Sequence, residues 1–488
     1  MLGSSHEDRQ QLEMVCIDDL VPKDHLLRKI AAILDTDFIR KETAPLYSDR
    51  GRPGVDPVVL FKMLLISYLF GLRSERRVVQ EIQVNMAYRW FLGLKITDPV
   101  PHHSTISQNR RRRFLAANVE WNLFVHVVKQ AVESGFIDGR TLFTDSTHVK
   151  ANANKHSTVS RKGKDVPQEA VERSIERHLA AMEEERALID DDTEADLAKA
   201  INADREAAGK KPLDLKPEES GESEPDTQPA ASAGLTVSLT DPEAAFMVRE
   251  GKPDGFHYLE HRTVEGRHGF IVHLRVTSAK LTDPVVYLSC LKAVIDLYQF
   301  GVKAVGLDAG YYSNAICHSL IEQGIFPAIG VRGTRPAKGM LGKWRFKYVW
   351  NLDAYLCPGD HLLRYTTTNR EGYREYKSSP AVCKTCPMLE ICTKAKNKQK
   401  VIQRHVWQDD KDLVRIHNKT ELGQSLLQRR RETVERSFAD GKELHGLRYA
   451  RFRGRKKVER QSLLSATAQN LKKLANLLSR PLSRAQAA

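Results

Sequence analysis

The sequence predicts a mixed α/β protein with a helical N-terminal region, and three observations support this fold class. The first 130 or so residues carry apolar side chains at helical spacing. From residue 141 onward, short apolar runs alternate with helical stretches, as in a mixed sheet with flanking helices. Two segments interrupt that pattern, a charged one at 157–234 and a cysteine-containing one at 340–405 that we expect to be β-rich.

The size and composition of the chain predict a multidomain protein that stays in solution. Its 488 residues exceed the size at which one hydrophobic core stops growing, so we expect two or three domains. The N-terminus is polar and has no apolar signal-peptide stretch. The longest apolar run, from Val58 to Phe70, is too short for a membrane span, which needs roughly 20 residues. We therefore expect a soluble, cytoplasmic protein with no membrane partner.

The positive charge of the chain is unevenly distributed. The formal net charge is +14, but residues 157–234 hold 11 Lys and Arg against 20 Asp and Glu. The rest of the chain therefore carries +23, and the last 60 residues hold 16 Lys and Arg against 5 Asp and Glu. A basic surface of this size favours a polyanionic partner, with nucleic acid the first candidate. The alternative is a basic protein that is merely well solvated.

The helical N-terminal region contains a candidate DNA reader. Asp56 precedes a proline and predicts the start of a helix that runs to Phe70 and is apolar nearly all round, hence buried. Thr105 and Gln108 have the spacing of a capping box that opens a helix carrying four arginines. Short helices followed by such a basic helix suit a helix-turn-helix motif, or else a helical bundle with a basic face. The candidate phosphate-binding residues are Arg110, Arg111 and Arg112.

The two interrupting segments differ in composition. Residues 157–234 contain no aromatic residue of the Phe, Trp or Tyr type; we expect helix in the first half and disorder in Gly209–Gly234. The segment 340–405 contains four cysteines whose thiolates suffice for a closed tetrahedral Zn²⁺ site. The alternative is four reduced thiols without metal. These four are Cys357, Cys383, Cys386 and Cys392.

Two aspartates end predicted strands in the second half of the pattern. Asp145 follows the apolar stretch that begins at Thr141, and Asp308 follows the run that begins at Lys303. Burying an acid at such a position is costly unless the acid is paired or bound to metal. Each alone could be a capping Asp at a turn, but the two together in a basic protein favour a functional role. Phosphoryl transfer by two hard divalent cations requires such oxygen ligands.

A glutamate flanked by cations is the third candidate. Arg431, Glu435 and Lys442 are spaced i, i+4 and i+11, so on an α-helix they fall within roughly 40° of one another. This arrangement suits a glutamate that binds metal while the neighbouring cations meet phosphate. The alternative is a salt-bridge ladder on the helix surface.

These residues resemble a known family. The chain is similar to bacterial insertion-sequence transposases of the DDE type, in particular the group with a helical N-terminal domain and a ribonuclease-H-like catalytic domain. The sequence has Gln428 where the family signature has Tyr, and His148 where the family often has Lys. The resemblance rests on the stretches beginning at Asp56 and His103, on Asp145–Asn154, on Leu307–Tyr311, and on Arg431-x3-Glu435-x6-Lys442 with Gly446 and Arg453-Gly454 after it.

The resemblance implies a domain organisation and a metal site. Residues 1–135 would form the helical, helix-turn-helix-like DNA-binding domain, and 136–156 with 235–480 the ribonuclease-H-like catalytic domain. The segments 157–234 and 340–405 would be insertions. Asp145, Asp308 and Glu435 would hold two Mg²⁺ or Mn²⁺ ions, while structural Zn²⁺ in the cysteine cluster would be a second metal.

The resemblance also implies an activity and its partners. The enzyme would hydrolyse the phosphodiester at an element end, and the freed 3′-OH would attack target DNA. Arg431 and Lys442 would contact phosphates near the cleavage point. The partners would be double-stranded DNA, as terminal inverted repeats and target, and a second copy of the chain, in the nucleoid of a bacterium. The alternatives are a non-catalytic DNA-binding regulator derived from a transposase, and a nuclease that cuts without joining.

Overall fold

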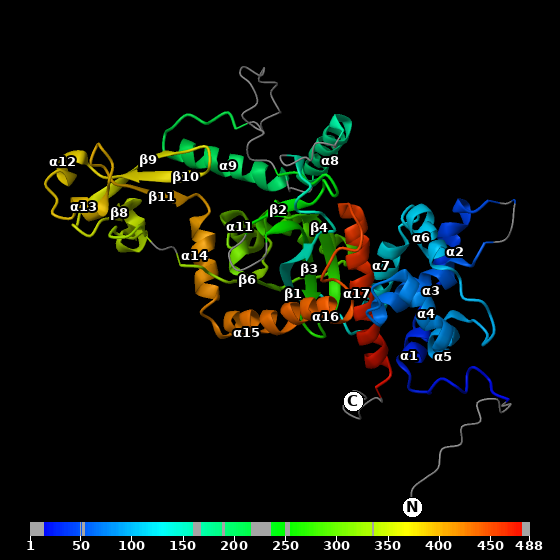
Figure 1. The fold of residues 1–488 in the computed structure, drawn as a ribbon. Coiled ribbons are helices and arrows are strands. Elements are labelled where there is room, and N and C mark those ends of the chain that lie inside the picture. Colours follow the sequence, from blue (N-terminus) through cyan, green and yellow to red (C-terminus); the bar gives the residue numbers. More distant parts are fainter. Residues whose placement is uncertain are drawn as a thin grey trace, which may run out of the picture.

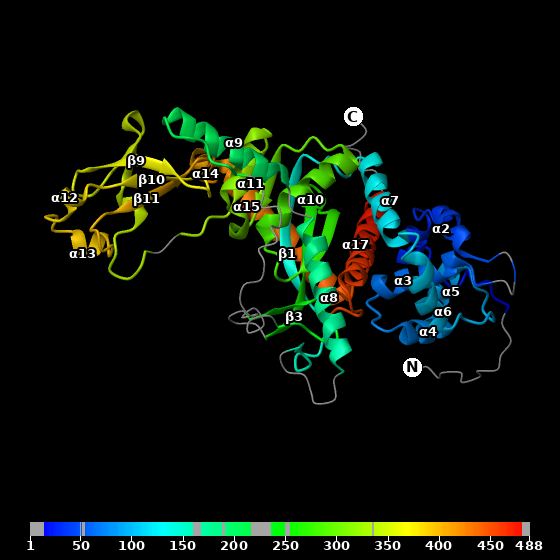
Figure 2. The ribbon, with the colours of Figure 1, turned by 90° about the horizontal axis from the view of Figure 1, so that it is seen from above.

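The computed structural model describes residues 14–48, 50, 54–159, 167–187, 191–215, 236–248, 254–333 and 336–480. Helices gather at the N-terminal end, a mixed sheet lies in the middle, and a second sheet lies at the opposite end (Figures 1 and 2). The expected class, mixed α/β with a helical N-terminal region, is confirmed.

The N-terminal helices pack around a buried central helix. Asp56 caps α3 by accepting a hydrogen bond from the Val58 amide, and most of α3 is buried, as its apolar sequence predicts. The helices of this region are α1 (Leu26–Ala31), α2 (Asp37–Thr43), α3 (Pro57–Leu69), α4 (Glu75–Val84), α5 (Met86–Leu92), α6 (His103–Asn109) and α7 (Val119–Glu133).

The basic helix begins earlier than the sequence predicted. The N-cap of α6 is His102, whose side chain accepts from the Ser104 amide, so the capping box expected at Thr105 is not formed. The helix then passes into a π-helical turn over Arg110–Phe114, where the Leu115 amide bonds to the Arg110 carbonyl. The imidazole of His102 therefore caps the helix three residues before the position expected for the Thr105 hydroxyl.

A six-stranded mixed sheet forms the centre of the molecule. Strands follow the order β4-β3-β1-β5-β6, with β2 also paired to β3. The pairs β4–β3 and β3–β1 are antiparallel, whereas β1–β5 and β5–β6 are parallel. The strands are β1 (Thr141–Lys150), β2 (Ala245–Met247), β3 (Gly255–Glu265), β4 (Ile271–Ser278), β5 (Ala304–Leu307) and β6 (Phe326–Ile329).

Strand β1 is longer than the sequence predicted. The expected strand ended at Asp145, but β1 continues to Lys150. The reason is tertiary: β3 pairs with β1 along its whole length, from Leu142 opposite Glu265 to Lys150 opposite His257. Asp145 therefore lies within a strand and not at its end.

One helix joins the N-terminal helices to the sheet. Helix α17 lies between α7 and α3 on one side and β4 on the other, and is buried nearly all round from Val458 to Ala475 (Figures 1 and 2). Asn470 exchanges two hydrogen bonds with the backbone of Ile271 in β4, at 2.9 and 2.7 Å. A single hydrophobic core consequently runs from Leu27 to Ala475.

The remaining helices surround the sheet. Two of them, α10 and α11, connect β4 to β5 and β5 to β6, and the others follow the second sheet. Their bounds are α10 (Asp283–Tyr298), α11 (Asn314–Glu322), α14 (Gln408–His417), α15 (Glu421–Arg430), α16 (Arg436–Leu444) and α17 (Arg455–Leu478), with a π-helical turn at Arg431–Glu435 between α15 and α16.

The first half of the charged segment is helical, as expected. It forms α8 (Gln168–Arg186) and α9 (Asp191–Ala207). The disorder expected in the second half falls mainly on 216–235, outside the described residues. Helix α9 contacts the second sheet, where Arg205 donates to the Thr367 hydroxyl at 3.0 Å and the Thr368 carbonyl at 2.6 Å.

The cysteine-containing segment is β-rich, as expected. Its antiparallel sheet has the order β11-β10-β9-β8-β7. The strands are β7 (Lys347–Val349), β8 (Ala354–Leu356), β9 (Leu362–Thr368), β10 (Tyr373–Lys377) and β11 (Val401–His405), and two short helices, α12 (Pro380–Cys383) and α13 (Leu389–Cys392), follow β10. Across the described part of the chain, no helix combines the length and apolarity needed to cross a membrane.

Candidate active site

Asp145 lies in β1 and Asp308 directly follows β5, so the two acids occupy neighbouring positions along two parallel strands. Thr144 of β1 pairs with Leu307 of β5. Asp145 directly follows Thr144 in the sequence, and Asp308 directly follows Leu307. Neighbouring strands are about 4.8 Å apart, so the two carboxylates project from adjacent backbone positions. Sequence reasoning predicted both acids, and the parallel pairing of β1 with β5 brings them together.

The environment of Asp145 disfavours its ionised form. Its side chain is 17% exposed. Burial raises the pKa of Asp145 to about 6, and the nearby carboxylates of Asp308 and Asp283 also raise it. The Arg430 guanidinium and the Ser146 amide, which donates at 2.8 Å, act in the opposite direction. Asp145 is therefore a carboxylate that would gain from a further cation.

Asp308 is held by a tight turn. Its Oδ1 accepts a hydrogen bond from the Gly310 amide at 2.5 Å and caps a 3₁₀ turn, Ala309–Tyr311. A Cβ on Gly310 would lie 2.8 Å from that oxygen, so any larger residue there would displace the Asp308 carboxylate. Asp283 at the start of α10 lies close to the same turn. A Cβ added at Gly310 would be 3.9 Å from the Oδ2 of Asp283.

Glu435 reaches the site from a π-helical turn. The turn Arg431–Glu435 interrupts the helix between α15 and α16, and π geometry puts residues five apart on one face. Arg430, five residues before Glu435, is buried and bridges two acids: it lies 3.4 Å from the Glu435 carboxylate and 3.3 Å from that of Asp145. The Glu435 side chain itself is 59% exposed.

The π turn changes the register assumed for the Arg-x3-Glu pattern. On a regular α-helix Arg431 would lie beside Glu435, but in the structure Arg431 is exposed and Arg430 makes the contacts. The phosphate contact expected of Arg431 stays a prediction. Lys442 on α16 donates to the Thr147 hydroxyl of β1 at 2.5 Å, two residues beyond Asp145 on the same strand face. Lys442 therefore lies close to Asp145, and the phosphate contacts expected of Lys442 and Arg431 both stay predictions.

A fully buried ion pair fixes α16 to the sheet. Arg262 of β3, paired opposite Asp145, bonds to Glu260 at 2.8 and 2.5 Å. It also donates to the carbonyl and hydroxyl of Ser437 at 2.8 and 2.6 Å, and stacks on Phe438. Because a buried charge needs such partners, this network holds the helix that carries Glu435 over β1.

The three carboxylates do not form a complete metal centre in the structure. Within the described ranges, no group of three or more His, Cys, Asp and Glu side chains is arranged to hold a metal ion. Arg430 lies between Asp145 and Glu435, where its charge offsets theirs. The donor set itself consists of carboxylate oxygens, the ligands that Mg²⁺ and Mn²⁺ prefer.

The arginines at the end of α6 have different environments. Arg110 is largely buried, 3.2 Å from the Glu75 carboxylate and stacked on Phe452. Arg111 and Arg112 are exposed. The first is therefore committed to internal contacts, whereas the other two are accessible to a partner.

The four clustered cysteines share one cavity of about 190 Å³. All seven cysteines of the chain are free thiols. Burial raises the pKa of Cys392, and the three other cysteines of the cluster raise it further, which shows that their sulfurs are close. The cluster expected from the sequence is thus brought together, while zinc and the metal-free alternative both stay predictions.

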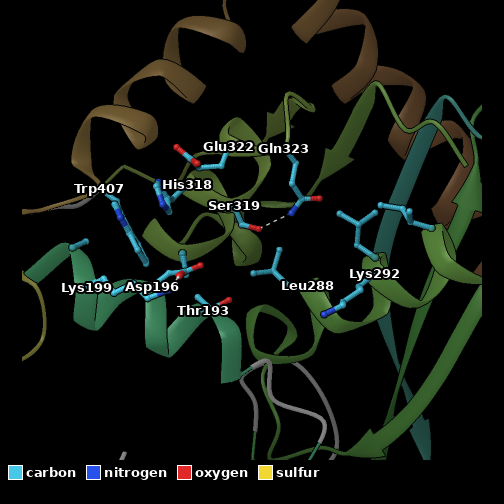
Figure 3. Close-up of a pocket in the computed structure, with 14 residues that line it drawn as sticks. Thr193, Asp196, Lys199, Leu288, Lys292, His318, Ser319, Glu322, Gln323 and Trp407 are labelled. Carbon is cyan, nitrogen blue, oxygen red and sulfur yellow. Dashed lines mark hydrogen bonds and ion pairs between the residues drawn. The ribbon is translucent and has the colours of Figure 1, made fainter. Parts of the chain in front are cut away.

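A larger cavity of about 660 Å³ lies elsewhere, between α9, α10 and α11 (Figure 3). Its wall includes His318, which stacks on Trp407 with ring centres 4.2 Å apart and pairs with Asp410 at 2.7 Å. Neither Asp145, Asp308 nor Glu435 belongs to its described lining. This cavity is separate from the candidate active site.

Sequence reasoning missed three contributors to the site. Arg262 had a signal, because Glu260 and Arg262 carry opposite charges two positions apart and so lie on one face of a predicted strand. Arg430 had none, since a π turn leaves no recognisable spacing. Asp283 looked like an ordinary acid in the first turn of α10.

Carboxylates gathered beside cationic side chains in a basic chain are typical of enzymes that act on nucleic acid phosphates. Two family comparisons make this specific. Residues 15–112 match a family described as a transposase domain (DUF772), and residues 356–475 match the family described as the transposase DDE domain. The matches confirm the resemblance to insertion-sequence transposases of the DDE type and support a transposase function.

The DDE match includes Glu435 but neither aspartate, so it leaves the roles of the individual residues as predictions. Searches of curated proteins and of solved structures gave no match.

Proposed function

We propose that the chain is a DNA transposase whose site consists of Asp145, Asp308 and Glu435. The observation that carries the proposal is the adjacent placement of Asp145 and Asp308 on β1 and β5, beside the helix that bears Glu435. Three antiparallel strands followed by two parallel ones, in the order β4-β3-β1-β5-β6, support a ribonuclease-H-like sheet.

The three carboxylates would hold two Mg²⁺ or Mn²⁺ ions. When bound, such ions activate the attacking water or 3′-OH and stabilise the charge on the transferred phosphate. The raised pKa of Asp145 supports this role, because ionisation made unfavourable by burial, and further by Asp308, would be relieved by a cation. Arg430 would move off Asp145 and Glu435 as the ions enter.

The basic side chains would position the DNA. Lys442 lies over β1 beside Thr147, two residues from Asp145, and would contact a phosphate next to the scissile bond. Arg431 is exposed and would also contact a phosphate near the cleavage point, whereas the exposed Arg111 and Arg112 would contact phosphates further away. The homodimer, the use of inverted repeats and target DNA, and nucleoid association belong to the same proposal, as does Zn²⁺ in the cysteine cavity.

Strand cleavage on DNA that carries the element ends tests the proposal. Mg²⁺-dependent cleavage should be abolished, while DNA binding persists, in each of three variants: Asp145→Asn, Asp308→Asn and Glu435→Gln. Asp296→Asn, on the exposed side of α10, is the matched control and should cleave normally. Near wild-type cleavage by any of the three variants would remove that residue from the site.

The same assay separates the alternatives. A regulator would bind ends without cutting them, and a nuclease would cut without forming joined product. The transposase proposal requires both cleavage and joining by one preparation.

A further inference from the structure

A basic groove lies between the N-terminal helices and the loop that follows α16. Its volume is about 460 Å³. Three separate segments supply its arginines: the start of α4 with the residue before its N-cap, the π-helical turn after α6, and the loop 446–453. They are Arg73, Arg76, Arg110, Arg111 and Arg451.

The electrostatics of the groove favour an anion. Glu75 is the acid of the described lining, and the Arg110 guanidinium at 3.2 Å offsets its charge. Arg73 and Arg76 are exposed and, among the described residues, form no hydrogen bond or ion pair through their side chains. Several guanidinium groups therefore face the groove without an internal counterion.

Buried polar atoms in the wall lack partners. The Nε and one Nη of Arg451, and the Oγ of Ser67, are buried and have no hydrogen-bond partner among the described residues. Arg451 is held in place by stacking on Tyr68, with its guanidinium carbon 4.6 Å from the ring centre. Buried donors without partners are costly, and Arg451 therefore has donor capacity that no contact among the described residues uses.

The N-terminus of α4 adds donors to the same wall. Ser74 is the N-cap of this ten-residue helix, but its side chain makes no capping hydrogen bond. The first amides of α4 therefore remain available at the groove, and helix N-termini favour phosphate. The guanidinium groups and the helix terminus are suited to the same chemistry.

The groove is connected to the catalytic strand. Ala450 donates to the Lys150 carbonyl at 2.8 Å, and Tyr449 forms a bridge with Lys150 at the end of β1. Phe452 of the same loop stacks on Arg110 with 3.8 Å between guanidinium carbon and ring centre. The loop thus touches both the strand that carries Asp145 and the basic end of α6.

We propose that this groove binds a backbone phosphate of duplex DNA, with Arg451 as its central ligand and Arg73 and Arg76 at its rim. The inference rests on the proposed function and deepens it: one DNA would contact the N-terminal helices and the catalytic domain together. Arg451 would donate to the phosphate oxygens, as guanidinium groups do in bidentate contacts.

The test measures the affinity for a 40-base-pair duplex by fluorescence anisotropy over a range of salt concentrations. Each lost phosphate contact lowers the slope of log K against log salt by about 0.9. Arg451→Gln and Arg73→Gln should each weaken binding several-fold and lower the slope by about that amount. Arg173→Gln, on the exposed face of α8, is the control and should change neither.

Two outcomes would overturn the inference. Unchanged affinity and slope in both variants would show that the groove does not meet DNA. Weaker binding with an unchanged slope would show an effect other than a lost phosphate contact. Arg73 is exposed, so its variant keeps the test valid should Arg451→Gln fold poorly.

Cleavage distinguishes this inference from the proposed function. If Asp145→Asn abolishes cleavage while both arginine variants bind normally, the groove is wrong and the transposase proposal stands. If Asp145→Asn cleaves normally while the arginine variants lose binding, the groove stands and the carboxylate site is wrong.

Discussion

Replacing Asp145 by Asn should stabilise the metal-free protein at neutral pH. The pKa of Asp145 is raised from 3.8 to about 6, so above pH 6 its ionisation costs the folded state about 3 kcal/mol, at roughly 1.4 kcal/mol per pH unit. The stability that the protonated acid provides is fully present below pH 3.8 and is lost as the pH rises through 6. Asn carries no charge and therefore removes the cost.

The assay compares apparent melting temperatures of wild type and Asp145→Asn in chelator at pH 7.5 and at pH 4. A gain of about 3 kcal/mol corresponds to several degrees, and it should fall to less than about 1 kcal/mol at pH 4, where the acid in the folded protein is largely protonated. Mn²⁺ at pH 7.5 should raise the melting temperature of wild type more than that of the variant. Asp296→Asn should show no pH-dependent difference.

A variant less stable than wild type at pH 7.5 would refute this reasoning. So would a gain that is the same at both pH values, because it would not come from ionisation.

Three further predictions follow from the same contacts. Gly310→Ala puts a Cβ 2.8 Å from the Asp308 carboxylate, so DNA cleavage should fall at least tenfold with little change in DNA affinity. The control is Gly301→Ala, whose added Cβ would have no atom within 4 Å, and this variant should be active. Arg430→Gln should lower the melting temperature in chelator, because Arg430 bridges Asp145 and Glu435. Arg431→Gln should leave the melting temperature unchanged. Equal effects of the two substitutions would contradict the assignment of these contacts to Arg430. Metal analysis of protein purified without chelator should find about one zinc per chain, and a value near zero would favour the metal-free thiols.

Much of the fold could be predicted because its signals are local. Asp56 before proline marked the start of α3, and the apolar run after it marked a buried helix. The end of β1 could not be predicted, since its last five residues are strand only because β3 pairs with them. The position of α17 in the shared core likewise depends on partners far away in sequence.

The candidate site could be predicted in part. Asp145 and Asp308 were recognisable as acids after apolar runs, but their adjacency depends on the parallel pairing of β1 with β5. Arg431 was chosen on the assumption of α-helical spacing, and the π turn gives the contact to Arg430 instead. Such a turn leaves no pattern in the sequence, and the contacts that Arg262 makes with Ser437 just after it join residues far apart in the chain.

The most direct test of the shared carboxylate site is a count of bound Mn²⁺ in the presence of duplex DNA, by electron paramagnetic resonance. The account predicts two ions per wild-type chain and fewer in Asp145→Asn, Asp308→Asn and Glu435→Gln alike, with Asp296→Asn unchanged. Two ions retained in any of the three variants would contradict the claim that these carboxylates hold the metals together.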